Sequence, residues 1–397
     1  MMNYNRLIFL FILAISFSTN NIYGQDNQEV VDGQNILNTV TTAVPFLTIT
    51  PDSRAGSMGE VGAASTPDIH SLHWNSAKLA FLEPNFGAAV SYTPWLRKLI
   101  PDIAMSYLTL YNKIGQNGTF AGALRYFSLG EITFTDASGQ DIKNENPNEL
   151  SVDLAYAMKF SNNLSGGIAM RYIYSNLTGG LEVGSIETQA GQAFAIDLGT
   201  YYEADIDENN QWAMGLNISN IGTKISYTQD DEDFLPTNLK LGGRYSLNID
   251  EYNRFSVMMD VNKLLVPTPA LYDQTGDIIA GESDNVSVVQ GIFQSFGDAP
   301  GGIQEEWREL MYSVGLEYWY NNQFAFRGGY FHEHATKGNR KYFNTGIGLK
   351  MSALTIDFSY LISATPGQQS PLESTIRFSL IFNMGSLSSI INDQNVQ

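Results

Sequence analysis

Residues 353–362, Ala-Leu-Thr-Ile-Asp-Phe-Ser-Tyr-Leu-Ile, alternate large apolar side chains with small or polar ones. Successive side chains of a β-strand point to opposite faces. One face of this segment therefore carries Leu354, Ile356, Phe358, Tyr360 and Ile362. The opposite face carries Thr355, Asp357 and Ser359. A carboxylate between large apolar residues at this spacing predicts a sheet with hydrocarbon on one side and water on the other.

The same alternation recurs in other parts of the chain. In residues 150–159 one face holds Leu150, Val152, Leu154, Tyr156 and Met158, and the other holds Ser151, Asp153, Ala155 and Lys159. In residues 212–219 the two faces are Trp212, Met214, Leu216, Ile218 and Ala213, Gly215, Asn217, Ser219. Repeated over segments of about ten residues, this pattern is typical of a transmembrane β-barrel.

Fourteen such segments predict fourteen strands: 85–94, 103–112, 119–128, 149–160, 163–175, 191–203, 211–220, 239–249, 253–264, 311–321, 323–332, 341–351, 353–363 and 373–383. Their connections alternate strictly between two classes. The short class is 112–115, 161–162, 205–210, 250–252, 321–322 and 351–352. The other class is 129–148, 176–190, 221–238 and 265–310, with shorter members at 95–102, 333–340 and 364–372. Tight periplasmic turns alternating with longer extracellular loops, and an even strand number, are typical of bacterial outer-membrane barrels. The predicted fold class is an all-β membrane protein with a 14-stranded antiparallel barrel.

The first residues predict export. Asn5-Arg6 precedes an apolar run from Leu7 to Phe17, and a polar stretch then ends at Gly24. A basic start, an apolar stretch and a small residue at the end indicate a signal peptide over residues 1–24. No Cys follows the expected cleavage point, which excludes a lipoprotein anchor, and no run of roughly 18 apolar residues follows Gly24. We expect the mature chain to begin near Gln25 in the outer membrane of a bacterium, with its loops at the cell surface.

Residues 25–84 do not show the strand alternation and contain much Gly, Ala and Ser. Fourteen strands enclose a lumen that is wider than the inward side chains can fill. The sequence therefore predicts a hatch inside the lumen over 25–84, followed by the barrel over 85–397. A separate periplasmic mini-domain is the alternative.

Composition agrees with this class of protein. Aromatic residues make up 12% of the chain, as expected for girdles at the two membrane interfaces. The net charge of −19 argues against a nucleic-acid partner, and the absence of Cys excludes disulfides and thiolate ligands.

The candidate chemical sites are weak. His70 and His73 lie three residues apart, and His332 and His334 two apart, but neither pair is expected to converge with further zinc ligands. The acidic run 230–233 lacks the spacing and the turn glycine of a calcium loop. No Ser-His pairing is visible on adjacent strands, so we expect neither an enzyme nor a cofactor or metal site.

Charged residues on the inward faces are expected to pair with one another and with the hatch. They are Asp153, Lys159, Arg171, Asp197, Lys240, Arg244, Asp260, Arg327, Lys350, Asp357 and Arg377.

The element Asn75-Ser76-Ala77-Lys78-Leu79-Ala80-Phe81, preceding fourteen strands, resembles the hatch motif of the long-chain fatty-acid transporter superfamily, with Ser76 in place of the usual Pro. Within that superfamily the chain resembles the PorV-like shuttle proteins of the type IX secretion system of Bacteroidetes. The resemblance runs from about residue 40 to 383. Its stretches are 43–47, 57–60, 298–302, 317–320, 327–333 and 337–342.

The resemblance implies a protein that binds the C-terminal β-domain signal of secreted cargo, collects the cargo from the translocon pore subunit and delivers it to a surface attachment complex that contains a sortase. Exposed apolar loop surface usually marks a partner site. The candidate partner-binding residues are Phe234, Leu235, Val289, Ile292, Phe293, Phe296 and Trp307. Loop 265–310 could instead pack on itself as a lid. The alternative function is an outer-membrane transporter for fatty acids or other hydrophobic small molecules.

Overall fold

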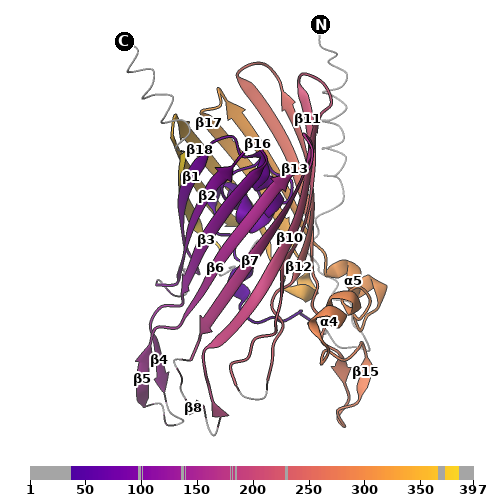
Figure 1. Ribbon diagram of the computed structural model, residues 1–397. Coiled ribbons are helices and arrows are strands. Elements are labelled where there is room, and N and C mark those ends of the chain that lie inside the picture. Colours follow the sequence, from indigo (N-terminus) through magenta and orange to yellow (C-terminus); the bar gives the residue numbers. More distant parts are fainter. Residues whose placement is uncertain are drawn as a thin grey trace. The chain divides into compact units, whose positions relative to one another are not determined.

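Fourteen strands form a closed antiparallel barrel in a computed structural model (Figure 1). The structure describes residues 37–383 except 97–99, 101, 136–137, 139, 179, 181, 184–185, 229–230 and 365–371. The predicted signal peptide and residues 25–36 of the predicted hatch lie outside this range. The barrel strands are β1 (Phe86–Pro94), β2 (Ala104–Ile114), β3 (Gly118–Ser128), β6 (Asn148–Lys159), β7 (Leu164–Asn176), β10 (Gly191–Asp205), β11 (Asn210–Gly222), β12 (Asn238–Asn248), β13 (Asn253–Leu264), β16 (Met311–Tyr320), β17 (Phe324–His332), β18 (Lys341–Met351), β19 (Leu354–Ser363) and β20 (Ile376–Asn383).

Each of the fourteen predicted strands is confirmed, with ends that differ by three residues at most. Each strand pairs with its neighbours in the chain, and β1 closes the ring by pairing with β20. The alternation of short turns and longer loops is also confirmed, and Figure 1 shows the loop hairpins gathered at one end of the barrel. We call this the loop end and the opposite end the turn end. The hairpins are β4 (Ile132–Thr135) with β5 (Asp141–Glu145), β8 (Glu182–Val183) with β9 (Ile186–Glu187), and β14 (Leu271–Tyr272) with β15 (Ile278–Ala280).

The two faces of the wall differ as the alternation predicts. On β19, Phe358 is 39% exposed whereas its neighbour Asp357 is 1% exposed. On β6, Leu154 is exposed and Asp153 is buried. Apolar side chains therefore cover the outside of the barrel, which faces the hydrocarbon of the membrane. Polar side chains face the lumen. Among the described residues no helix is long and apolar enough to cross a membrane.

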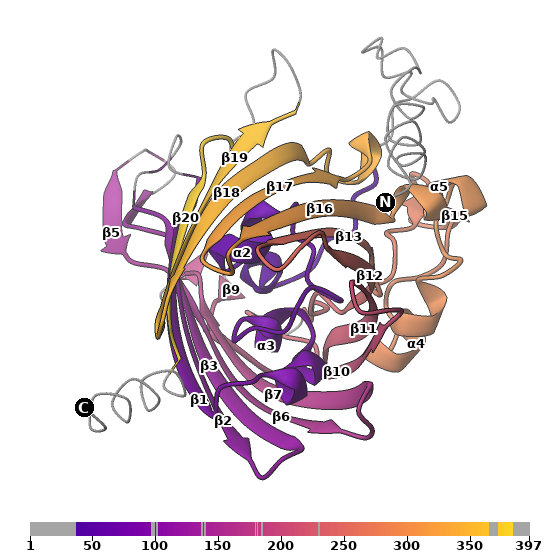
Figure 2. The same ribbon diagram turned by 90° about the horizontal axis from the view of Figure 1, so that it is seen from above.

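The chain between Leu37 and Glu83, here called the inner segment, lies within the ring of strands (Figure 2). It contains four short helices: η1 (Pro45–Thr48), α2 (Ser53–Ser57), α3 (Ser71–Trp74) and η2 (Ser76–Phe81). Three further helices lie in the loops: α4 (Val288–Gln294), α5 (Ile303–Arg308) and η3 (Ala335–Lys337).

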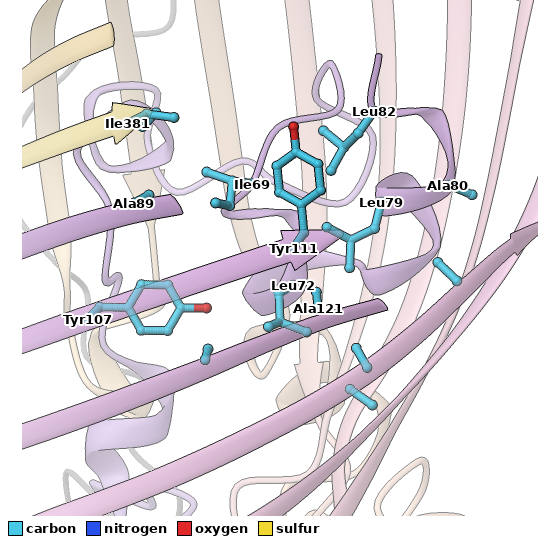
Figure 3. Packing of buried hydrophobic residues seen from close by; sticks show 14 residues of the cluster. Ile69, Leu72, Leu79, Ala80, Leu82, Ala89, Tyr107, Tyr111, Ala121 and Ile381 are labelled. Atoms are coloured by element: carbon cyan, nitrogen blue, oxygen red, sulfur yellow. The ribbon is translucent and has the colours of Figure 1, made fainter. Parts of the chain in front are cut away.

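Apolar contacts hold one side of the inner segment to the wall. Leu72, Leu79 and Leu82 pack against Tyr107 and Tyr111 of β2 (Figure 3). All five side chains are at most 6% exposed. This cluster gives the lumen a packed core in place of a water-filled channel on that side.

The Asn75-Ser76-Ala77 element ties the inner segment to β10. The Asn75 amide donates to the carbonyls of Ala63 (3.0 Å) and Thr200 (2.9 Å), and its oxygen accepts from the N–H of Ala77 (3.1 Å). A side chain at Gly199 would meet the Asn75 oxygen at 2.3 Å, so glycine permits this close approach. The element therefore caps η2 and fixes it on the wall, while its assignment as a hatch motif stays a prediction.

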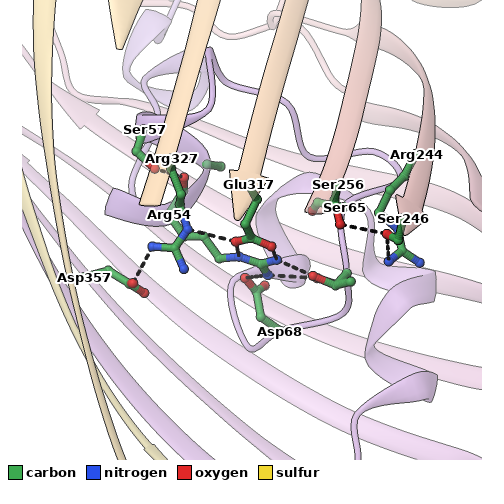
Figure 4. Close-up of polar contacts among 12 residues, drawn as sticks. Arg54, Ser57, Ser65, Asp68, Arg244, Ser246, Ser256, Glu317, Arg327 and Asp357 are labelled. Carbon is green, nitrogen blue, oxygen red and sulfur yellow. Dashed lines mark hydrogen bonds and ion pairs between the residues drawn. The ribbon is translucent and has the colours of Figure 1, made fainter. Parts of the chain in front are cut away.

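Ion pairs hold the other side of the inner segment to the barrel wall. Arg54 of α2 contacts Glu317 at 2.9 Å and Asp68 at 2.8 Å (Figure 4). Glu317 also accepts from Arg327 at 2.8 Å, and Arg327 reaches Asp357 at 2.5 Å. The carboxylate of Glu317 is thus shared between the inner segment and the wall.

The predicted pairing of lumen charges is confirmed for Arg327 with Asp357, for Arg171 with Asp153 and Asp197, and for Lys240 with Asp260 at 3.9 Å. Lys159 instead lies over the ring of Phe81, 4.3 Å from its centroid. Glu317, which the sequence analysis did not single out, is one carboxylate that joins the two parts, and Asp260, which accepts from the N–H groups of Gly62 and Ala63, is another.

Replacing Phe358 by Arg tests the lipid face. Near the bilayer midplane this change should lower the free energy of unfolding by about 2–4 kcal/mol, because a charged side chain would face hydrocarbon. A denaturant titration of the barrel refolded into vesicles measures the loss. Phe358→Leu is the control, and equal stability of the two variants would show that Phe358 does not face lipid.

Replacing Glu317 by Gln tests the shared carboxylate. The change leaves two buried guanidinium groups without their common partner, so the free energy of unfolding should fall by about 3–5 kcal/mol. Glu145→Gln, in the partly exposed Lys143–Glu145 pair of the β4–β5 hairpin, should cost about 0–1 kcal/mol in the same titration. Similar losses in the two variants would contradict the assignment.

Candidate functional site

Residues 265–310 form a folded unit at the loop end, here called the platform. It contains the β14–β15 hairpin and helices α4 and α5, which lie outside the ring of strands (Figure 2). Helix α4 begins where the Ser287 side chain accepts from the N–H of Gln290. The platform is therefore a structured surface beside the barrel wall.

Large apolar side chains on the platform are exposed. On α4, Val289 is 64% exposed and Phe293 is 74% exposed, and Phe296 just after the helix is 52% exposed. On α5, Ile303 is 69% exposed and Trp307 is 63% exposed. The described residues do not cover these side chains, so the platform offers apolar area to another molecule.

Buried ion pairs fix the platform to the barrel. Lys263, at the end of β13, contacts Glu306 at 3.0 Å and Glu309 at 2.5 Å. Lys337 of η3 contacts Glu305 at 2.5 Å and Glu309 at 3.0 Å. Burial alone would raise the pKa of Glu309, but bonds from Lys263 and Thr268 and the nearby Lys337 lower it below its ordinary value. The carboxylates of Glu305 and Glu306 on α5, and of Glu309 just after it, thus act as anchors that leave Ile303 and Trp307 facing outward.

A second contact sets the position of α4. Gly291 packs against Pro267 and Phe234, where an added side chain would meet both at 3.0–3.1 Å. Phe234 is half-buried there, with the Lys224 ammonium 4.3 Å from its ring centroid. The glycine therefore lets α4 lie close on the loop between β11 and β12.

The structure separates the predicted partner-binding residues into two groups. Val289, Phe293, Phe296 and Trp307 are exposed on the platform, and Ile292 is half-buried. Leu235 is only 2% exposed and packs in a cluster with Val44 and Ile225, so it does not reach the surface. Phe234 supports α4. Partner binding by the exposed group stays a prediction. The candidate set also omitted further exposed platform side chains, namely Tyr272, Ile278, Ile279 and Ile303.

The histidine pairs and residues 231–233 of the acidic run do not converge on one site. The Nδ1 of His73 accepts from the Arg125 guanidinium at 2.6 Å, and His334 contacts Thr336 at 3.0 Å. Burial and the positive charge of Arg125 hold the pKa of His73 well below its ordinary value. Within the part of the chain that the structure describes, no three His, Asp or Glu side chains are placed to hold a metal ion.

The loop carboxyl of Asp298 offers a test of how the platform is held. Its Oδ2 accepts from the N–H of Thr268 at 3.1 Å, while Oδ1 is buried without a hydrogen-bond partner among the described residues. Burial raises the pKa of Asp298 to about 6, and the nearby Glu306 and Glu309 add to the rise. Because the pKa of Asp298 is raised in the folded protein, its neutral carboxyl contributes to the stability of the fold at a pH below the unfolded pKa near 4. This contribution is lost as the pH rises through the folded pKa of about 6.

Asp298→Asn should therefore stabilise the platform at pH 7.5 and have less effect at pH 5. The amide keeps the Thr268 bond without burying a charge. After allowing for solvent screening, the gain should be on the order of 1 kcal/mol. Hydrogen exchange of the amides in 265–310 measures it, with the exposed Asp284→Asn as control. A gain that does not change with pH would contradict this reading of Asp298.

Comparison with solved structures shows the fold. The toluene transporter TodX of Pseudomonas putida is 11% identical to this chain, over 87% of this chain and 98% of that chain, with a TM-score of 0.50. The toluene transporter TbuX of Ralstonia pickettii is 12% identical, over 84% and 97%, with a TM-score of 0.46. A FadL homologue of Pseudomonas aeruginosa is 10% identical, over 87% and 99%, with a TM-score of 0.45. No curated protein sequence matched the chain.

A family model shows more than the fold. The model described as type IX secretion system protein PorV matches residues 32–271, more than half of the 397 residues. The match covers the inner segment and the strands from β1 to β13. The apolar outside of the barrel agrees with an outer-membrane location. This chain therefore belongs to the PorV family, as an outer-membrane component of the type IX secretion system.

Proposed function

We propose that this chain binds secreted cargo proteins through their C-terminal β-domain signal, collects them from the translocon pore subunit and delivers them to a sortase-containing attachment complex. The observation that carries the proposal is the platform, whose exposed Val289, Phe293, Phe296, Ile303 and Trp307 sit on a base fixed by ion pairs. A few apolar and aromatic side chains on a rigid base are the usual anchors of a protein interface.

The charge of the platform favours a protein partner over the lipid surface. Residues 265–310 contain eight Asp and Glu but only one basic residue, Arg308. Three of the carboxylates are paired with Lys263 and Lys337, and that of Asp298 is buried. The acidic surface consists of the four exposed carboxylates, those of Asp273, Asp277, Glu282 and Asp284. An acidic surface is repelled by anionic lipid headgroups, so the apolar side chains are poorly suited to rest in such a leaflet. A partner with apolar side chains inside a basic rim would match both features.

A β-domain is a suitable cargo for this end of the barrel. The loops carry three short two-stranded sheets, and an extended segment can add to a strand edge while its side chains enter neighbouring pockets. Docking by strand addition needs no catalytic residues, as is usual for a protein that only binds its partner.

The transporter alternative makes a different demand. A carrier of fatty acids would need an apolar path through the lumen, whereas binding at the platform needs only the outer surface. Protein cargo that co-purifies with the detergent-extracted barrel would support the shuttle. Lipid alone would support the transporter.

Replacing Phe293 or Phe296 by Ser should weaken cargo binding. Loss of a buried aromatic anchor commonly costs about 2 kcal/mol or more, which lowers the affinity more than tenfold. The measurement is the amount of secreted protein that co-purifies with the tagged barrel from its own cells, with heat-modifiability as the check of folding.

Ile206→Ser is the matched control, because Ile206 is 60% exposed in the turn between β10 and β11, at the turn end. It should leave cargo recovery unchanged. Undiminished recovery with both Phe293→Ser and Phe296→Ser would overturn the platform as the cargo site.

A further inference from the structure

A cavity of about 400 Å³ lies inside the loop end of the lumen. On one side it is lined by residues from Thr39 to Thr48 of the inner segment. On the other side it is lined by β11, β12, β13, β16 and β17 and by the loop after β17. Its volume is within the range of about 300–1,000 Å³ typical of ligand sites. We call it the outer cavity.

A group of asparagines lies in its wall. Asn217 of β11, Lys240 of β12 and Asn262 of β13 are in register across three neighbouring strands. Asn238 lies two residues from Lys240, and all four side chains line the outer cavity. Asn217 is 3% exposed and Asn262 is 4% exposed.

The side-chain oxygens of Asn217, Asn238 and Asn262 are buried with no hydrogen-bond partner among the described residues. A buried amide without a partner costs about 1–3 kcal/mol, and most proteins avoid it. The three amides line one cavity, and a ligand in that cavity could satisfy their unpaired oxygens. An amide oxygen accepts hydrogen bonds, so the ligand has to supply N–H or O–H donors.

The charged groups of the outer cavity are already occupied. Glu333 pairs with Arg340 at 2.8 Å, and Glu309 pairs with Lys337 at 3.0 Å. Lys240 lies 3.9 Å from Asp260 and donates to the carbonyl of Glu60 at 3.3 Å. Three carboxylates and three cations line the cavity, namely Glu60, Glu309, Glu333, Lys240, Lys337 and Arg340. A ligand without net charge fits this balance.

Two other neutral ligand classes fit less well. A sugar ring usually stacks on an aromatic face, but the ring of Trp74 lies under the Lys240 ammonium at 4.6 Å, and Phe331 is covered by Tyr342 and Arg340. An apolar molecule would leave the three amides unpaired in a drier site, which raises their cost. Polypeptide backbone supplies the N–H donors that the three amide oxygens lack.

The inner segment adds backbone groups of the same kind. From Thr39 to Thr42 no backbone hydrogen bond to another described segment is formed, and the first is that of the Ala43 N–H to the Phe234 carbonyl at 3.0 Å. Unpaired backbone beside a cavity can pair with an extended peptide.

We infer that the outer cavity binds an extended, uncharged stretch of polypeptide from the cargo, held by the amides of Asn217, Asn238 and Asn262. The inference rests on the proposed function and adds a second contact, separate from the platform. The cargo domain would dock outside while a short segment of its chain enters the lumen.

The chain contains no Cys, so a single introduced thiol reports one position. Asn238→Cys is labelled with a short photoreactive maleimide in cells that secrete cargo, then irradiated, and the adducts are identified by mass spectrometry. Polypeptide adducts are expected at this position and not with Asn321→Cys, labelled to the same extent in the turn between β16 and β17. Adducts to glycan or lipid, or no adduct above the Asn321→Cys level, would overturn the inference.

A second measurement uses the paired variant Asn217→Leu with Asn262→Leu, which should lower the amount of cargo that co-purifies at least tenfold. Asn344→Leu is the matched control, because Asn344 is 4% exposed on β18, also lacks partners for its amide among the described residues, and does not line the outer cavity. It should leave recovery unchanged.

The outcomes separate the two proposals. Wild-type protein that retains no cargo would contradict the proposed function itself. Wild-type protein that retains cargo, with equal recovery by the paired variant, would overturn only the outer cavity as a peptide site. If the paired variant fails to fold, the Asn238→Cys adducts decide.

Discussion

The width of the barrel is the constraint on which the rest of this structure depends. A wall in hydrocarbon must pair all of its backbone groups, and closure through β1 and β20 achieves this. Fourteen strands then enclose more space than their inward side chains fill. The inner segment occupies that space, and Glu317, shared between Arg54 and Arg327, joins it to the wall. Polar residues in the lumen are thus structural contacts between two parts of one chain.

The fold could be predicted almost completely because the membrane acts on each residue separately. Whether Phe358 faces lipid and Asp357 faces the lumen follows from a period of two, without knowledge of any distant residue. Strand count and loop parity follow from the same local signal. The inner segment has no such period, so only its composition indicated that it is not part of the wall. Its contacts could not be predicted locally, because Asn75 bonds to Thr200, which lies 125 positions away in the chain.

The candidate site could be predicted only in part, because the exposure of a loop side chain also depends on distant residues. An apolar side chain in a loop can be exposed or can pack within the loop, and the sequence does not separate Phe293 from Leu235. The difference lies in tertiary contacts: Gly291 lets α4 approach Phe234, while Leu235 meets Val44 of the inner segment. Asn217 and Asn262 fall on predicted strands and Asn238 directly precedes one, but their missing partners appear only when β11, β12 and β13 are placed beside the inner segment.

The acidic composition of the platform has a consequence for the behaviour of many copies in one membrane. Surfaces that carry the same excess of negative charge repel one another over roughly 8–10 Å at physiological ionic strength. The exposed carboxylates of the platform therefore oppose the self-association that the exposed rings of Phe293 and Trp307 would otherwise favour, and they attract a basic partner. A crowded outer membrane could then hold these barrels as separate, receptive molecules, and a rise in salt would weaken both effects together.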